Sequence, residues 1–572
     1  MTGNRPPHQQ LTLKFVSFSS LPKEQPKPYT YTPLEPGFIR TIKVHPRSES
    51  IPLLITIDHD RLDEPHLTYA ALSYVWGSAE LTHRIKCNFN TFVSVTSNAA
   101  SALQHIRRKT KPIYVWIDAL CIDQSNIAER NAQVRLMGNI YAKATMTYVY
   151  LGVADDDSRV AMKYIKEHDH NGRQHATRLR SGFELERKAL GSFLDRTWFN
   201  RIWVLQEVFL SRNAKVMCGE EEVRWGDVLS AYNFLLKNRN LFDWPYLPPV
   251  LGLKSRRYLW DLLCLTRQCC STDPRDKVYA LLSMTKAEGD KVEVDYSMDC
   301  GQLYVNVAVH LFKSGGLDFL LAAQYFPSNI VVPSWVPNWS LRFDVSHVSA
   351  EHRPLAPFER AGGFHAAADI CTIDSSGHVK SIVDGEMLVP RDPVLRVQAM
   401  IMGEIVAMDD VHIIQGSEWR KELRLIGSRF RDCTGHRMKW SDVLGNGCQC
   451  CVVKQKGLPI DIAWRTMTAG RAGNKRPVGA VSTTKAEIVG STVNGCRLFI
   501  TKCGHIGLTP GNISYGDYIC ILKGAWTPCI VRHIESGFWI LVAGYCYLDG
   551  AMKGEVVACQ LGDEVWRELL LR

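Results

Sequence analysis

Short apolar runs alternate with stretches of helical periodicity through the first third of the chain. The apolar runs cover residues 68–76, 113–118 and 146–151, and the amphipathic stretches cover 98–108 and 126–143. Strands that alternate with helices predict βαβ units, in which helices cover both faces of a parallel sheet. The sequence therefore predicts an α/β domain, and ligands of such sheets bind beyond the carboxyl ends of the strands.

Two loops follow these predicted strands and carry small or polar residues. The loop after Trp76 begins with Gly77, and the loop after the second strand contains Asp118 and Asp123. Aspartates at strand ends can bind the hydroxyl groups of a ribose, but they also cap helices and close turns. The sequence pattern leaves both roles open for the two aspartates.

The segment 195–208, DRTWFNRIWVLQEV, has the periodicity of a helix. Trp203 and Glu207 are four residues apart, so a helix places them on one face, one turn from each other. A carboxylate beside a flat apolar surface suits cleavage of a ribosyl bond, because negative charge stabilises an oxocarbenium-like transition state. The same spacing fits a helix that packs through its tryptophan and carries a surface acid.

The length of 572 residues predicts several domains, because single cores stop growing at about 250–300 residues. A polar stretch at 155–188 is expected to be an exposed insertion, and short β-runs separated by glycine near the C-terminus predict a small antiparallel module. The predicted division is an extended lead-in (1–46), an α/β domain (47–237), a helical accessory region (238–345), a variable linker (346–494) and a β-rich module (495–572).

Composition indicates a soluble globular protein. The chain is 46% hydrophobic, 10% aromatic and 22% charged. Its net charge of +10, from 68 basic and 58 acidic residues, is a mild excess, so we expect no nucleic-acid partner. The apolar runs are too short or too interrupted to cross a bilayer, so no membrane span is predicted.

The 18 cysteines follow no repeating framework, which indicates reduced thiols and a cytoplasmic protein. One group deserves weighing as a zinc site: Cys433, His436, Cys448, Cys450 and Cys451. Their spacing fits no standard two-by-two arrangement of zinc ligands, so a cysteine-rich loop is preferred and no metal is predicted.

Three long blocks now indicate a family. They are YAALSYVWG at 69–77, the segment YVWIDALCIDQ through YVYLG at 114–152, and RTWFNRIWVLQEVFLSRNAKVMCG at 196–219. Together and in this order they resemble the fungal heterokaryon-incompatibility (HET) domain proteins. Later pieces such as DPRDKVYALL at 273–282 and PSWVPNWS at 333–340 resemble the extended members of that family.

HET domains resemble the TIR fold, a flavodoxin-like parallel sheet. LSYVWG corresponds to the first TIR strand, and WVLQEV corresponds to the Trp-Cys-x-x-Glu-Leu segment of TIR domains, with Val at position 204 in place of Cys. In catalytically active TIR domains that glutamate supports cleavage of NAD at the nicotinamide–ribose bond. The resemblance thus implies that Glu207 is the catalytic acid. It implies a pocket for NAD formed by Ser73, Tyr74, Trp76, Gly77, Asp118, Asp123 and Trp203.

The expected function follows from the same resemblance. No Gly-x-Gly-x-x-Gly fingerprint is present, so NAD is expected to be a substrate and not a bound cofactor. The protein is expected to be an effector of fungal non-self recognition and regulated cell death, which self-associates through its HET domain and responds to an unidentified activating partner. The alternative is a non-catalytic signalling module that acts by homotypic TIR-like assembly.

Overall fold

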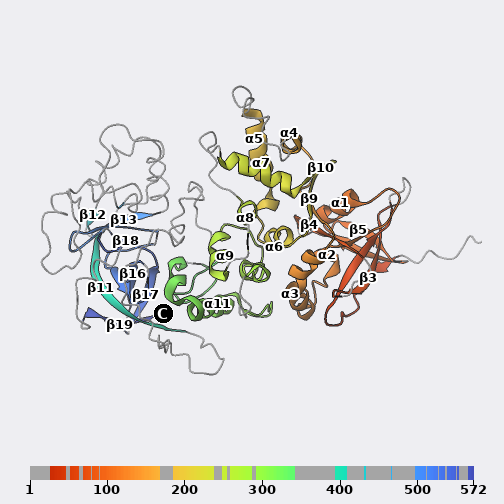
Figure 1. The fold of residues 1–572 in the computed structure, drawn as a ribbon. Helices are drawn as coiled ribbons and strands as arrows, with labels where there is room; N and C mark the ends of the chain where they lie inside the picture. Colours follow the sequence, from red (N-terminus) through yellow and green to blue (C-terminus); the bar gives the residue numbers. More distant parts are fainter. Residues whose placement is uncertain are drawn as a thin grey trace, which may run out of the picture.

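Two β-sheets lie at opposite sides of the molecule, with helices between them (Figure 1). This computed structural model describes residues 26–46, 52–63, 68–78, 80–88, 90–167, 184–237, 248–253, 255, 258–285, 292–326, 328–341, 393–408, 431–432, 466, 496–510, 512–525, 527–534, 537–548, 550–552 and 565–572.

The N-terminal sheet contains ten of the described strands, in the spatial order β1-β6-β5-β3-β2-β7-β4-β8-β9-β10. Their bounds are β1 (Lys27–Pro28), β2 (Phe38–Val44), β3 (Leu54–Arg61), β4 (Ala70–Tyr74), β5 (His83–Cys87), β6 (Thr91–Val95), β7 (Ile113–Trp116), β8 (Thr147–Tyr150), β9 (Ala214–Cys218) and β10 (Glu221–Arg224). The four neighbours β7, β4, β8 and β9 are parallel, whereas β2 runs antiparallel to β3 and β7. The α/β prediction is confirmed, but the sheet as a whole is mixed. It also takes in β1 and β2, which the sequence assigned to the lead-in.

The parallel strands have a doubly wound order. Along the chain β4 comes first, β7 second, β8 third and β9 fourth, so their order across the sheet is second, first, third, fourth. The connections from β4 therefore leave to opposite sides. A crevice forms at such a switch point, outside the carboxyl ends of the two strands where the winding reverses, which here are β4 and β8.

The helices of this part follow the predicted alternation. They are α1 (Ser97–Ile106), α2 (Asp118–Cys121), α3 (Ile127–Lys143), α4 (Asp156–Glu167), α5 (Glu184–Leu194), α6 (Val204–Phe209) and α7 (Trp225–Lys237). Thr96 and Asn126 cap α1 and α3 by accepting hydrogen bonds from backbone N–H groups of the first turn. The expected exposed insertion is wrong for α4, which buries Ala161, Met162 and Ile165 against the core. Residues 168–183 of that stretch lie outside the described residues.

The periodicity of the segment 195–208 predicted one continuous helix, and this prediction is wrong. A 3-10 turn, η2 (Thr197–Asn200), is followed by extended backbone at Arg201, and α6 begins only at Val204. The break has a tertiary cause. The N–H of Ile202 donates to the carbonyl of Cys270 at 3.0 Å, so it is not available for a helical hydrogen bond.

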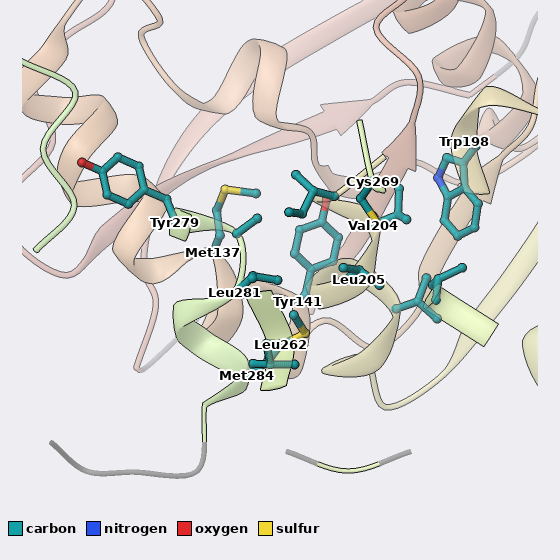
Figure 2. Close-up of a cluster of buried hydrophobic side chains, with 14 of the residues drawn as sticks. Met137, Tyr141, Trp198, Val204, Leu205, Leu262, Cys269, Tyr279, Leu281 and Met284 are labelled. Atoms are coloured by element: carbon teal, nitrogen blue, oxygen red, sulfur yellow. The ribbon is translucent and has the colours of Figure 1, made fainter. Parts of the chain in front are cut away.

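The middle of the chain is helical, as predicted. It comprises α8 (Pro249–Gly252), α9 (Leu259–Leu265), α10 (Asp276–Tyr279), η4 (Leu282–Met284), α11 (Cys300–Gly315) and η5 (Gly316–Ala322). Figure 2 shows that this region shares a core with the N-terminal domain: Met137 and Tyr141 of α3 and Leu205 of α6 pack in one cluster with Leu262 and Leu281. The segment 333–340 forms no regular element and buries Trp335 and Trp339.

The C-terminal sheet is built around β11 (Leu395–Met408), the long curved strand in Figure 1. It also contains β12 (Arg431–Asp432), β13 (Arg497–Thr501), β14 (Ile506–Thr509), β15 (Tyr518–Leu522), β16 (Cys529–His533), β17 (Phe538–Ala543), β18 (Tyr547–Leu548) and β19 (Arg567–Leu571). The pairing is mainly antiparallel, as predicted, with a parallel pair between β17 and β19. However, β11 falls in the stretch predicted as a variable linker. In the described part of the chain, no helix is long and apolar enough to pass through a membrane.

A buried ion pair joins an interior strand of the N-terminal sheet to the helix α3. Arg40 of β2 is fully buried, and its guanidinium makes two hydrogen bonds to Glu129 of α3, at 2.5 and 3.0 Å. Removing one partner leaves the other charge uncompensated in the interior. We expect Glu129→Ala to lower the free energy of unfolding by about 3–5 kcal/mol, measured by urea titration.

The matched control is Glu222→Ala, because Glu222 pairs with Lys215 on the surface of β9 and β10. That change is expected to cost less than about 1 kcal/mol. Equal losses for the two variants would contradict a structural role for the buried pair.

Candidate functional site

The centre of the candidate site is the Glu207 carboxylate. Glu207 lies on α6 and is 3% exposed. Its Oε2 accepts a hydrogen bond from the Oγ of Ser73 on β4, and Ser73 Oγ accepts one from the indole N–H of Trp198 on η2, at 2.8 Å. A chain of hydrogen bonds therefore runs from η2 through the central strand to α6.

Burial governs the ionisation of this carboxyl. The loss of water raises the pKa of Glu207 to about 7, while the nearby Arg201 guanidinium and the hydrogen bond from Ser73 lower it and Asp118 raises it. The group is thus partly protonated at neutral pH. A carboxyl with such a pKa can exchange a proton near neutrality and can also offer negative charge.

Arg201 supplies the positive charge between two acids. Its guanidinium donates a hydrogen bond to the carbonyl of Tyr74, the last residue of β4. It lowers the pKa values of both Glu207 and Asp118. Asp118 begins α2, where its carboxylate accepts a hydrogen bond from the indole N–H of Trp76 at 2.8 Å, and burial raises its pKa. The ends of β4 and β7 and the segment before α6 thus meet in one mixed-charge cluster.

Several sequence-predicted residues come together here. Ser73 contacts Glu207 directly, and Trp76 contacts Asp118. Tyr74 is buried near the same charges: burial, Asp118 and Glu207 raise the pKa of its hydroxyl, and Arg201 lowers it. The Tyr74 hydroxyl has no hydrogen-bond partner within the described part of the chain.

Three predicted residues have other surroundings. Asp123 closes a turn, with its Oδ1 accepting hydrogen bonds from the N–H and the hydroxyl of Ser125 at 3.1 and 2.6 Å. Trp203 directs its indole N–H to Asp276 of the accessory region. Gly77 has a positive φ of 74°, and a Cβ there would lie 2.7 Å from the side-chain nitrogen of Asn98, so its place in the turn is structural.

Trp198 and Arg201 were missed by the sequence reasoning. Both lie in the segment RTWFNRIWVLQEV, which already contained the candidate Glu207. A continuous helix selects the residues three or four positions before the glutamate, which are Trp203 and Val204. The break in the helix at Arg201 instead brings Trp198 and Arg201 to the site. The signal in the sequence that could have identified these residues is a basic residue, Arg201, between the two tryptophans Trp198 and Trp203.

The helical accessory region contacts α6 and the segment that precedes it. The hydroxyl of Ser283 donates to Gln206 on α6 at 2.6 Å, and the backbone of Cys270 pairs with the chain on either side of Arg201. Figure 2 shows Val204 and Leu205 of α6 inside the shared hydrophobic cluster. Contacts from the accessory region therefore fix the position of both Glu207 and Arg201.

No metal site emerges from the described residues. Among them, no group of three or more His, Cys, Asp or Glu side chains is arranged to hold an ion. The predicted cysteine-rich loop, from Cys433 to Cys451, lies outside the described residues.

Comparison with known proteins now adds to this geometry. Residues 69–207 match the family model of the heterokaryon incompatibility protein (HET), and residues 475–566 match that of the Het-6 beta-barrel domain. The chain is 24% identical over 659 aligned positions to heterokaryon incompatibility protein 6, OR allele, of Neurospora crassa; the alignment covers 91% of this chain and 94% of that protein. No solved structure matches the chain.

The raised pKa of Glu207 predicts a specific dependence of stability on pH. A carboxyl whose pKa rises from 4.5 to about 7 on folding binds its proton more tightly in the folded state. Wild-type protein should therefore lose stability relative to Glu207→Gln as pH rises from about 4.5 to about 7, by roughly 3 kcal/mol in total. Denaturant unfolding at a series of pH values measures this difference, and Glu222→Gln serves as control. Parallel curves for wild type and Glu207→Gln would rule out the shift.

Arg201 should set where that loss occurs. Removing its charge with Arg201→Met takes away the cation that lowers the pKa of Glu207, so the loss should extend to higher pH and become larger in total. The surface change Arg224→Met, on β10, should leave the range unchanged. An unchanged pH range in Arg201→Met would show that the guanidinium does not act on Glu207.

Proposed function

We propose that this chain, which carries a HET domain and is similar along its length to a heterokaryon incompatibility protein, is an effector of fungal non-self recognition that acts by hydrolysing NAD. The reaction would cleave the bond between nicotinamide and ribose, consume one water and release nicotinamide and ADP-ribose. The resulting loss of NAD would drive regulated cell death. One observation carries the proposal: the Glu207 carboxyl, with its pKa near 7, is hydrogen-bonded to Ser73 at the end of the central strand.

The chemistry needs few groups. Nicotinamide leaves as a neutral molecule because it is already a pyridinium in NAD, so no acid must protonate it. The enzyme has to position the ribose, stabilise positive charge at its anomeric carbon and take a proton from the attacking water. The anionic form of Glu207 suits the second and third tasks.

The topology supports the comparison with TIR domains. The parallel strands follow the order second, first, third, fourth, which agrees with the flavodoxin-like order 2-1-3-4-5. Glu207 comes between the third and fourth of these strands along the chain, on α6, and contacts Ser73 near the carboxyl end of β4. The same likeness of strand order to TIR domains also supports self-association through the HET domain.

Access to the carboxylate is closed in this structure. Glu207 is 3% exposed, and Ser73 and Trp198 contact each other beside it. The proposed reaction therefore includes a step in which the Trp198–Ser73 hydrogen bond opens before the ribose reaches Glu207. Self-association or an activating partner would supply that step.

The same closure favours a second function. A carboxyl sealed in the interior also suits a non-catalytic module in which Glu207 holds α6 to the sheet and signalling occurs by homotypic assembly. The two functions differ in what a glutamine at position 207 does.

The deciding experiment compares full-length wild type with Glu207→Gln. We expect wild type to release nicotinamide from NAD at high protein concentration, with a rate that increases as pH passes about 7, and the variant to be slower by at least about 100-fold. Nicotinamide is quantified by chromatography. The rise with pH reports the carboxylate itself and would not follow from a folding defect.

Glu222→Gln, a surface glutamate on β10, should keep the wild-type rate and serves as the matched control. Cell killing is scored with the same variants. If neither wild type nor Glu207→Gln releases nicotinamide and both kill cells equally, hydrolysis is refuted and the assembly function stands.

A further inference from the structure

Two free cysteines face each other across neighbouring strands of the C-terminal sheet. Cys520 on β15 and Cys529 on β16 are directly opposite in the antiparallel register, and their Sγ atoms are 3.2 Å apart. Directly opposite residues of an antiparallel pair have Cα atoms about 4.5–5.5 Å apart, which is within the range that a disulfide bridges. A disulfide at this position needs the two sulfurs to approach by roughly 1 Å, without movement of the backbone.

The pair lies on the face of the sheet that meets the helical accessory region. Cys520 and Cys529 belong to the hydrophobic cluster that continues into that region. Their neighbours along the two strands, Ile519 and Ile530, belong to the separate cluster of the C-terminal sheet. Successive side chains of a strand point to opposite faces of a sheet, so the two thiols lie at the interface and not inside the C-terminal sheet.

The accessory region contacts the sheet on both sides of the pair. The start of β16 lies between the ends of β15 and β17. Just after β15, a Cβ added at Gly524 would lie 3.8 Å from Cδ1 of Leu317 on η5. Just after β17, the N–H of Gly544 donates to the carbonyl of Ala323, the residue that follows η5, at 3.0 Å. The two thiols are 0% and 2% exposed, so this cover shields them from solutes.

The two sulfurs of the pair are not equivalent. The hydrogen bond with Cys529 and burial raise the pKa of the Cys520 thiol. Cys520 therefore keeps its proton, and its S–H donates to the sulfur of Cys529. The thiolate is the nucleophile in thiol oxidation, so Cys529 is the sulfur that reacts first and Cys520 is the sulfur that resolves the product.

We propose that Cys520 and Cys529 are a site of oxidation by hydrogen peroxide, at which a disulfide forms when the accessory region separates from the C-terminal sheet. This inference goes beyond the proposed NAD hydrolysis and does not depend on it. Its basis is the register of the two strands, the contact between the sulfurs and the cover over them.

The oxidation proceeds in two steps. The Cys529 thiolate attacks one peroxide oxygen and the O–O bond breaks, which leaves a sulfenic acid, while the released hydroxide takes up the proton that Cys529 lost and becomes water. The sulfur of Cys520 then attacks the sulfenic sulfur: the S–S bond forms, the S–O bond breaks, and the hydroxide leaves with the proton of Cys520 as a second water. Two thiols are oxidised and one peroxide is reduced.

The test treats reduced full-length protein with hydrogen peroxide, blocks the remaining thiols with iodoacetamide in denaturant, and maps the peptides by mass spectrometry without reductant. We expect a cross-linked pair of peptides that contains Cys520 and Cys529 and is lighter than the two separate peptides by two hydrogen atoms. Recovery of both cysteines as free thiols, under conditions that oxidise the half-buried Cys503, would overturn the inference. A cross-link from Cys529 to Cys546 in place of Cys520 would overturn it as well.

The variant Cys520→Ala tests the order of the two steps. Without a resolving thiol, peroxide should convert Cys529 to a sulfinic acid, which the same peptide map detects. The matched control is Cys503→Ala, between β13 and β14 of the same sheet, which should leave the cross-link unchanged. If Cys529 stays a free thiol in Cys520→Ala, the assigned order is wrong.

The variant Gly544→Ala tests the cover. A Cβ at this position would collide with the carbonyl oxygen of Leu320, so the change forces η5 away from the sheet. The disulfide should then form at least about fivefold faster than in wild type, because local opening exposes the pair more often. Gly226→Ala on α7 is the control, since a Cβ there meets open space, and its rate should equal that of wild type. Equal rates in all three proteins would overturn the role of the accessory region as the cover.

Discussion

The hydrogen bond between Ser73 and the buried Glu207 carboxylate joins two parts of the chain that are 134 residues apart. An ionisable group in a protein interior is costly unless it is hydrogen-bonded and compensated by charge. Ser73 provides the hydrogen bond, Trp198 fixes the serine hydroxyl, and Arg201 provides the compensating charge. The position of α6 against β4, and the mixed-charge cluster at the ends of the central strands, both depend on these contacts.

The helical accessory region completes the N-terminal α/β domain. The backbone of Cys270 holds the chain extended beside Arg201, and Ser283 holds Gln206, next to the candidate carboxylate. The hydrophobic cluster in Figure 2 joins the two regions without a break, and residues 333–340 connect the helices onward to the C-terminal sheet through hydrogen bonds from Ser334 and Trp335. Packed structure is therefore continuous from the C-terminal sheet to α6.

Local patterns predicted the central strands of the N-terminal sheet and two of the helices that pack on it. The strands β4, β7 and β8 and the helices α1 and α3 lie within two residues of the predicted ranges, because their apolar spacing reflects burial that any such sheet imposes. The predictions were wrong where contacts with residues distant in the sequence override the conformation that the local sequence favours. Helix α4 is polar in sequence yet packs its few apolar residues inward, and the helix expected at 195–208 breaks where it meets Cys270. The strand β11 gave no local signal of its main partners, since all of them except the short β12 follow it by about ninety residues or more.

The sequence by itself determined the family resemblance, the α/β alternation and the candidacy of Glu207, because these rest on residue types and spacing along the chain. Only the tertiary structure decided which groups act on that carboxyl. Trp203, the expected neighbour, faces Asp276, while Trp198 and Arg201 take the places beside Ser73 and Glu207. The reason is that burial and charge compensation depend on distances between segments, and a break of one turn in a helix changes those distances without changing the sequence pattern.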